Sequence, residues 1–221
     1  MKKLLLIALM FTCTFLQAED PAPASVLKEL MAGNERYVND RLTHPNRSQE
    51  RRETIAAVQD PLAVIVGCSD SRVVPEIIFD QGLGDLFVVR TAGNVLGPIA
   101  LTSVEYGVKV VHATLIVVLG HENCGAIRAV LDGKDEVIEP IAKKVQEALR
   151  LKILLSENPV ENAVKVNVLG VVLGLRNHEL LRPLIAAGKL EIVGAYYHLE
   201  SGKVEICCGL ENEKVTETAK E

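Results

Sequence analysis

Short runs of consecutive apolar residues recur along the chain, separated by stretches whose apolar residues have helical spacing. The runs do not alternate with polar residues, which is typical of strands covered on both faces of a sheet. We predict strands at residues 62–67, 86–90, 115–120, 190–197 and 204–207, the last at a sheet edge. We predict helices at residues 101–111, 126–131, 138–155, 160–176 and 179–187. This alternation indicates an α/β fold with a mostly parallel central β-sheet flanked by helices, and with functional groups at the carboxyl ends of its strands.

Another amphipathic helix is predicted ahead of the first strand, at residues 25–41, with Ser25 as a candidate N-cap. We expect this N-terminal helix to be an arm that packs on the body of the domain or on a partner subunit. Residues 46–52 are polar and charged, and they favour a connection or the start of a short second helix.

The first eighteen residues have the order of features of a cleaved secretory signal. Lys2 and Lys3 precede a nearly uncharged run at residues 4–16, and Ala18 leads into an acidic segment. The run is shorter than the roughly 20 apolar residues of a membrane span, although a retained signal anchor is an alternative. We therefore predict a cleaved signal peptide at residues 1–18, a single domain at residues 19–221, and a periplasmic or other extracytoplasmic location without a stable membrane anchor.

Length and charge narrow the classes of protein that fit. A chain of 221 residues suits one domain with a full core. The formal net charge is −5, and it becomes −7 once Lys2 and Lys3 are removed with the signal. An acidic chain without a concentrated basic stripe argues against nucleic-acid binding.

Two pairs of metal-ligating side chains follow two of the predicted strands. Cys68 and Asp70 come at the end of the first strand, and His121 and Cys124 at the end of the third. Two thiolates, one imidazole and one carboxylate suit the tetrahedral preference of zinc. Spacings of two and three residues let both members of each pair reach one ion. The sequence therefore predicts a zinc site at this edge of the sheet.

An alternative for an exported protein is a disulfide between Cys68 and Cys124. That alternative leaves Arg72 unexplained, because a guanidinium two residues after Asp70 could hold the carboxylate bidentately and keep it off the metal. Asp70 would then have two stable partners, and only its pairing with Arg72 opens a coordination position for water, as a catalytic zinc requires.

Residues 68–73 and 120–125 together resemble the two-part signature of β-class carbonic anhydrases. The similarity continues at residues 75–76, 79–87, 90–94 and 103–106, and it resumes near 167–168 and at 188–202. It thus covers about residues 25–206. The resemblance implies reversible hydration of carbon dioxide to bicarbonate and a proton, by attack of zinc-bound hydroxide. It implies a zinc hydro-lyase with the metal on Cys68, His121 and Cys124, and with Asp70 and Arg72 as a gating dyad.

The resemblance also implies a substrate pocket formed by Gln59, Phe87 and Tyr106. In the family these residues reach the site across a dimer interface, so we expect a homodimer or a dimer of dimers. The same residue types also fit plainer roles, since aromatic residues are commonly part of a core and Gln59 lies in a predicted loop.

The chain departs from some family members at one position. Those members are inhibited by bicarbonate at a second site with a tryptophan three residues before the first zinc cysteine, where this chain has Ile65. We therefore predict that this inhibition is absent. Two rival functions use the same scaffold: a zinc enzyme for carbon disulfide or carbonyl sulfide, and a non-catalytic zinc or redox protein whose site Asp70 keeps closed.

Overall fold

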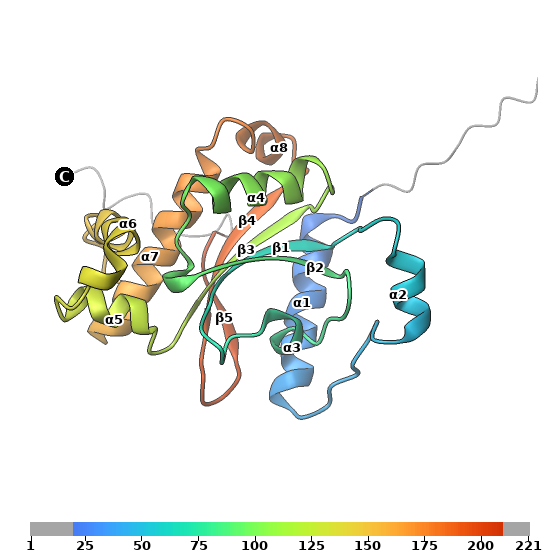
Figure 1. Cartoon of the computed structure of the whole chain (residues 1–221), viewed down its shortest axis with the longest axis horizontal. Coiled ribbons are helices and arrows are strands. Elements are labelled where there is room, and N and C mark those ends of the chain that lie inside the picture. The colour runs from blue at the N-terminus through green and yellow to red at the C-terminus, as the bar shows by residue number, and fades with distance from the viewer. Residues whose placement is uncertain (1–19, 210–221) are drawn as a thin grey trace, which may run out of the picture.

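A five-stranded sheet forms the centre of the protein in the computed structural model, which describes residues 20–209 (Figure 1). The predicted signal peptide lies outside the described residues. The strands are β1 (Ala63–Cys68), β2 (Leu86–Thr91), β3 (Leu115–His121), β4 (Glu191–Tyr197) and β5 (Val204–Cys208). Their order is β2-β1-β3-β4-β5; the first four are parallel, and β5 runs antiparallel to β4 at the edge. The predicted mostly parallel sheet and its edge strand are confirmed.

Helices flank both faces of this sheet. They are α1 (Pro23–Val38), α2 (Gln49–Ile55), α3 (Pro75–Ile78), α4 (Pro98–Lys109), α5 (Gly125–Leu131), α6 (Glu139–Leu149), α7 (Pro159–Arg176) and α8 (Arg182–Ala186), with short 3-10 turns η1 (Ala92–Asn94) and η2 (Glu136–Ile138). The α/β class predicted from the alternation of strands and helices is confirmed. Within residues 20–209, no helix combines the length and the apolar composition that crossing a membrane requires.

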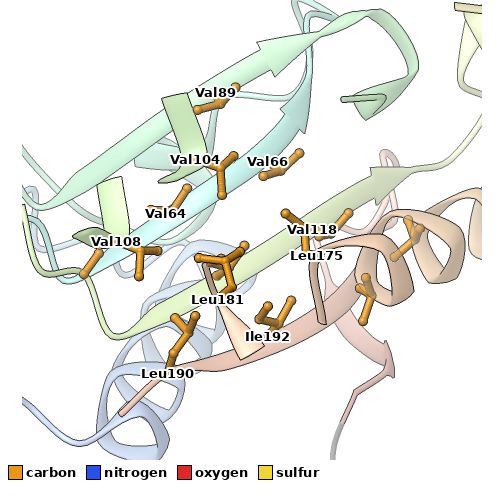
Figure 2. Packing of buried hydrophobic residues seen from close by; sticks show 14 of the residues in the cluster. Val64, Val66, Val89, Val104, Val108, Val118, Leu175, Leu181, Leu190 and Ile192 are labelled. Carbon is orange, nitrogen blue, oxygen red and sulfur yellow. The ribbon is translucent and has the colours of Figure 1, made fainter. Parts of the chain in front are cut away.

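Successive residues of each strand point to opposite faces, so the apolar runs supply two cores. Val64, Val66 and Val118 point toward α4, α7 and α8, where they pack with Val104 and Leu175 (Figure 2). The opposite face buries the alternate strand residues under α1 and α3. Both faces are thus covered, which explains why the strand sequences do not alternate with polar residues.

Helix α1 is held on its own chain by a buried amide as well as by apolar contacts. The Asn34 amide donates to the carbonyl oxygens of Ile78 and Gly202, at 3.1 and 2.9 Å, and its oxygen accepts from the Val204 backbone at 2.8 Å. Leu30 is buried in the core on the same side. The apolar side of this arm therefore packs on the body of the domain, and its contact with a partner subunit stays a prediction.

Several helix ends differ from the sequence-based expectation; for example, α4 begins at Pro98 and α8 at Arg182, where residues 101 and 179 were predicted. Helix α1 begins at Pro23, so Ser25 is not its N-cap but lies in the first turn, where its hydroxyl donates to the Ala22 carbonyl at 2.7 Å. Helix α6 ends at Leu149, well before the predicted residue 155. The chain has left the helix by Lys152, which has a left-handed φ of 52°.

Candidate metal centre

The carboxyl ends of β1 and β3 lie side by side because these two strands pair in parallel, with Gly67 opposite Leu119. This register brings together Cys68 at the end of β1, His121 at the end of β3, and Cys124 at the N-cap of α5. Their ligand atoms all lie within 4.8 Å of one another. All three residues are buried.

The orientation of the His121 ring leaves one nitrogen directed at this cluster. Nδ1 lies 2.9 Å from the Glu122 carbonyl oxygen. Since a carbonyl can only accept, Nδ1 carries the hydrogen, and Nε2 is left with its lone pair. Nε2 is fully buried and has no hydrogen-bond partner among the described residues. A buried acceptor nitrogen between two cysteine sulfurs is an arrangement that suits zinc.

The two cysteines are not joined by a disulfide, since their sulfurs lie 4.0 Å apart and a disulfide requires about 2.05 Å. A hydrogen bond from the Cys124 thiol lowers the pKa of Cys68 to about 4, although burial opposes this shift. The same contact, together with burial, raises the pKa of Cys124. Metal binding needs both sulfurs as thiolates, so it releases the proton that the two cysteines share.

Asp70 lies at the edge of this cluster and is held by Arg72. Nε of Arg72 donates to one carboxylate oxygen at 2.9 Å, Nη2 donates to the other at 2.7 Å, and the Arg72 backbone N–H adds a third bond at 3.0 Å. These bonds from Arg72, against a burial effect of opposite sign, hold the pKa of Asp70 well below its usual range. Oδ2 of Asp70 lies 3.8 Å from Nε2 of His121. The carboxylate thus stays ionised next to the three ligands.

The predicted carboxylate, imidazole and two thiols therefore meet at one edge of the sheet. A carbonic anhydrase family model matches residues 63–204 of the chain. The carbonic anhydrase of Mycolicibacterium smegmatis is 43% identical over 83% of this chain and 93% of its own length. The chain belongs to the β-class carbonic anhydrase family.

Solved structures agree with this assignment. A β-carbonic anhydrase of Coccomyxa, in complex with acetazolamide, is 26% identical, has a TM-score of 0.62, and is matched over 83% of this chain and 82% of that one. One of two tetrameric β-carbonic anhydrases from Sordaria macrospora shares the fold with a TM-score of 0.59 at 24% identity, over 84% of this chain and 96% of that one.

The sequence did not predict the hydrogen bonds that hold the metal ligands in place. The Gly93 backbone N–H donates to Cys68 Sγ at 3.3 Å, and the Gly93 carbonyl accepts from the buried Asn167 amide at 2.9 Å. Arg90 donates to the carbonyl oxygens of Cys68 and Asp70, at 2.9 and 2.6 Å. In the sequence, residues 90–94 and 167–168 stand out only through the family resemblance. Their contacts join distant parts of the chain, and no local pattern reports them.

The three predicted pocket residues do not join the metal cluster within one chain. Phe87 lies opposite Val64 in the β1–β2 register, four positions before Cys68, which places it about 13 Å back along the strand. The rings of Phe87 and Tyr106 contact each other with centroids 6.0 Å apart, and Tyr106 is 45% exposed. Gln59 lies exposed in the loop before β1.

Proposed function

We propose that this chain catalyses the reversible hydration of carbon dioxide to bicarbonate and a proton, with zinc held by Cys68, His121 and Cys124. One observation carries the proposal above the others. The buried Nε2 of His121 has no hydrogen-bond partner among the described residues and lies among two cysteine sulfurs, with an ionised Asp70 at the edge. A buried acceptor without a protein partner needs another partner, and a zinc ion held by the two sulfurs would supply it.

Zinc bound to these residues supplies the Lewis acidity that makes water a nucleophile near neutral pH. Asp70, as an ionised acceptor beside the three ligands, would accept a hydrogen bond from the hydroxide that zinc supplies and so orient it. Arg72 keeps Asp70 ionised and turned away from the metal, because it holds both carboxylate oxygens. Should Asp70 leave Arg72, its carboxylate could become the fourth ligand and close the site.

Membership of this family also implies a substrate pocket that is lined by residues of two subunits. Phe87 lies far from Cys68 of its own chain, and Tyr106 packs against Phe87. Both rings are partly exposed, Phe87 on β2 and Tyr106 on α4. Ile99 and Val110, 84% and 55% exposed, continue the apolar surface of α4 around Tyr106. We infer that this surface is covered by a second copy, whose metal centre then receives Phe87, Tyr106 and Gln59. A homodimer is thus the smallest active unit, alone or within a dimer of dimers, with α1 as the arm that contacts the partner.

Export of the enzyme is a separate part of the proposal, supported by the sequence of residues 1–18 alone. We infer that the signal is cleaved after Ala18 and that the mature enzyme acts in the periplasm or another extracytoplasmic space. In such a compartment, zinc would also keep Cys68 and Cys124 from forming a disulfide. Expression of the full-length gene product with sequencing of its mature N-terminus tests this; an intact Met1 in the cytoplasmic fraction would contradict it.

The activity is tested by measuring carbon dioxide hydration and zinc content on one sample of the mature protein at mildly alkaline pH. We expect about one zinc per chain, because the ligands form a single tetrahedral site. Hydration should be fast and lost on chelation. Cys68→Ala and His121→Ala should lose zinc and hydration together. Full zinc occupancy without hydration would contradict the proposed reaction, and hydration of carbon disulfide or carbonyl sulfide would then be measured instead.

A further inference from the structure

Two adjacent cysteines, Cys207 and Cys208, end the edge strand β5, and neither is among the metal ligands. In a regular strand their side chains would point to opposite faces of the sheet. Here the pairing of β4 with β5 shifts by one residue, since Ala195 lies opposite Ile206 but Gly194 lies opposite Cys208. Cys207 is therefore an extra residue on β5, and this end of the strand is a β-bulge.

The packing shows that the bulge turns both cysteine side chains toward helix α7. Ile206, just before them, packs on the core under α1. Cys208 belongs to the opposite core, because a Cβ added to Gly194 would collide both with the Cys208 sulfur and with Val168 of α7. Cys207 packs against this same core. Two consecutive side chains thus share one face of the sheet, which a strand without a bulge would not allow.

The two thiols also interact with each other. A hydrogen bond with Cys208, together with burial, raises the pKa of Cys207. Both residues are thiols in the structure, and no disulfide joins them. They differ in access, since Cys208 is 2% exposed whereas Cys207 is partly exposed. One sulfur can therefore be reached from solvent, and the second lies buried beside it.

We propose that Cys207 and Cys208 form a reversible redox site, which closes to a disulfide between the two neighbouring residues. The co-reactant is a small disulfide such as oxidised glutathione. The Cys207 thiolate attacks it, forms a mixed disulfide and releases one thiol; Cys208 then attacks the Cys207 sulfur, closes the ring and releases the second thiol. Two protein thiols are thus oxidised and one small disulfide is reduced, and the two protons pass to the released thiols.

The bulge also gives the backbone room to accommodate this ring. The extra residue of a bulge is unpaired in the ladder, so a change at Cys207 leaves the pairing of residues 204–206 with β4 in place. Neighbouring Cα atoms lie about 3.8 Å apart, below the usual lower limit of about 4.4 Å for a disulfide. A bond at this spacing is more easily reduced than a structural disulfide, so the site should cycle rather than stay closed.

The test equilibrates the zinc-loaded full mature enzyme with glutathione buffers of increasing oxidised fraction. Equilibrium is measured because the raised pKa of Cys207 makes thiol exchange slow. Samples are quenched with acid, denatured, alkylated and digested with trypsin. Residues 204–214 then form one peptide with both cysteines, whereas Cys68 and Cys124 fall in the separate peptides 53–72 and 110–128.

Mass spectrometry of the peptide 204–214 gives the result. We expect it to become two hydrogen masses lighter and resistant to alkylation in oxidising buffer, and to return to the dithiol in reduced glutathione. A peptide that stays a dithiol in every buffer would overturn the proposal. So would a peptide that carries glutathione without closing, or a disulfide between two chains on a non-reducing gel. None of these outcomes depends on whether the enzyme hydrates carbon dioxide.

Two single-thiol variants separate the two steps of the reaction. Cys208→Ser keeps the accessible thiol and should stop at the mixed disulfide with glutathione. Cys207→Ser keeps only the buried thiol and should stay reduced in the same buffers. Equal reactivity of the two variants would contradict the order of attack. The wild-type peptide decides the proposal by itself should Cys208→Ser, which places a hydroxyl in the core, fail to fold.

Discussion

Arg72 holds Asp70 through both carboxylate oxygens, at 2.9 and 2.7 Å, although the arginine side chain is itself 54% exposed. Asp70 is much less exposed, at 17%, and lies 3.8 Å from the His121 nitrogen that faces the two cysteines. The solvent-exposed Arg72 thus sets the position of the Asp70 carboxylate, which lies beside the metal ligands. Without Arg72, the carboxylate would lose both side-chain hydrogen bonds that hold it in this position.

Replacing Arg72 should therefore favour the closed site without removing zinc. For Arg72→Ala we expect full zinc content and hydration lowered by about 10- to 100-fold near neutral pH, as is common when a partner of a metal-site group is lost. Hydration and zinc content are measured together. Arg52→Ala, at an exposed position of α2, is the control and should behave as wild type. Unchanged hydration in Arg72→Ala would remove Arg72 as the gate.

Asn167 should control zinc affinity although it does not touch the metal. Its amide fixes the Gly93 carbonyl, and Gly93 in turn donates to Cys68 Sγ. In Asn167→Leu that carbonyl loses its donor, and we expect zinc affinity to fall by about 10- to 100-fold, measured by competition with a chromogenic chelator. Asn177→Leu, at the exposed end of the same helix, is the matched control. Equal affinities in the two variants would contradict this role.

The strands and the metal ligands could be predicted because each depends on a local signal. An apolar run covered on both faces predicts its own strand, and parallel strands deliver the residues after them to one edge. Cys68 and His121 lie where that rule places them. The end of α6 was missed because it depends on a tertiary contact: Oδ1 of Asn162, within α7, accepts from the backbone N–H groups of Leu155 and Ser156, at 2.6 and 3.2 Å.

The support around the site could not be read from any local pattern. Gly93 has a φ of 70°, which favours glycine, but nothing in the sequence says that its N–H meets a sulfur. Asn167 lies 74 positions away along the chain and looks like one more polar residue of a helix. A role of Phe87 and Tyr106 in the pocket of a partner subunit also depends on how the chains assemble. A single sequence indicates that assembly only through its family resemblance.

Asp80 should make the stability of the N-terminal segment depend on pH. Burial alone would raise its pKa, but hydrogen bonds from Thr43, Arg36 and the His44 backbone outweigh burial and hold the pKa well below its usual range. A folded-state pKa below the unfolded value of about 3.9 adds stability above that pH, and this stability is lost as the pH falls toward the folded-state pKa.

The variant Asp80→Asn tests this dependence. It replaces a buried acceptor with an amide that cannot satisfy all the donors, and we expect a loss of about 2–4 kcal/mol in the free energy of unfolding at pH 7. Urea unfolding of both proteins at pH 7, 5 and 3 gives the difference directly. The gap between them should shrink at pH 3, where wild-type Asp80 begins to lose its advantage. A gap independent of pH would mean that the Asp80 charge contributes nothing.

Bicarbonate should inhibit this enzyme only as a product. Ile65 occupies the position of the tryptophan in the second bicarbonate site of some relatives, and its side chain is fully buried in the core under α1. An apolar, inaccessible side chain offers bicarbonate no hydrogen bond. We expect hydration to decrease hyperbolically with bicarbonate, with a Hill coefficient of about 1, which indicates a single class of site. Initial rates over a bicarbonate series measure this, and cooperative inhibition would contradict it.

Mixing two inactive variants decides whether the active site is shared between subunits. Cys68→Ala removes the metal but leaves Phe87 intact, and Phe87→Ala keeps the metal but removes one pocket wall. In a mixed dimer, the metal site of the second variant faces the intact Phe87 of the first. Random exchange in a symmetric dimer should thus restore about one quarter of wild-type hydration. The control mixes Cys68→Ala with Cys124→Ala, which should restore nothing because both variants lack the metal. If the first mixture also stays inactive while mass spectrometry shows that subunits have exchanged, Phe87 acts within its own chain and the shared pocket is wrong.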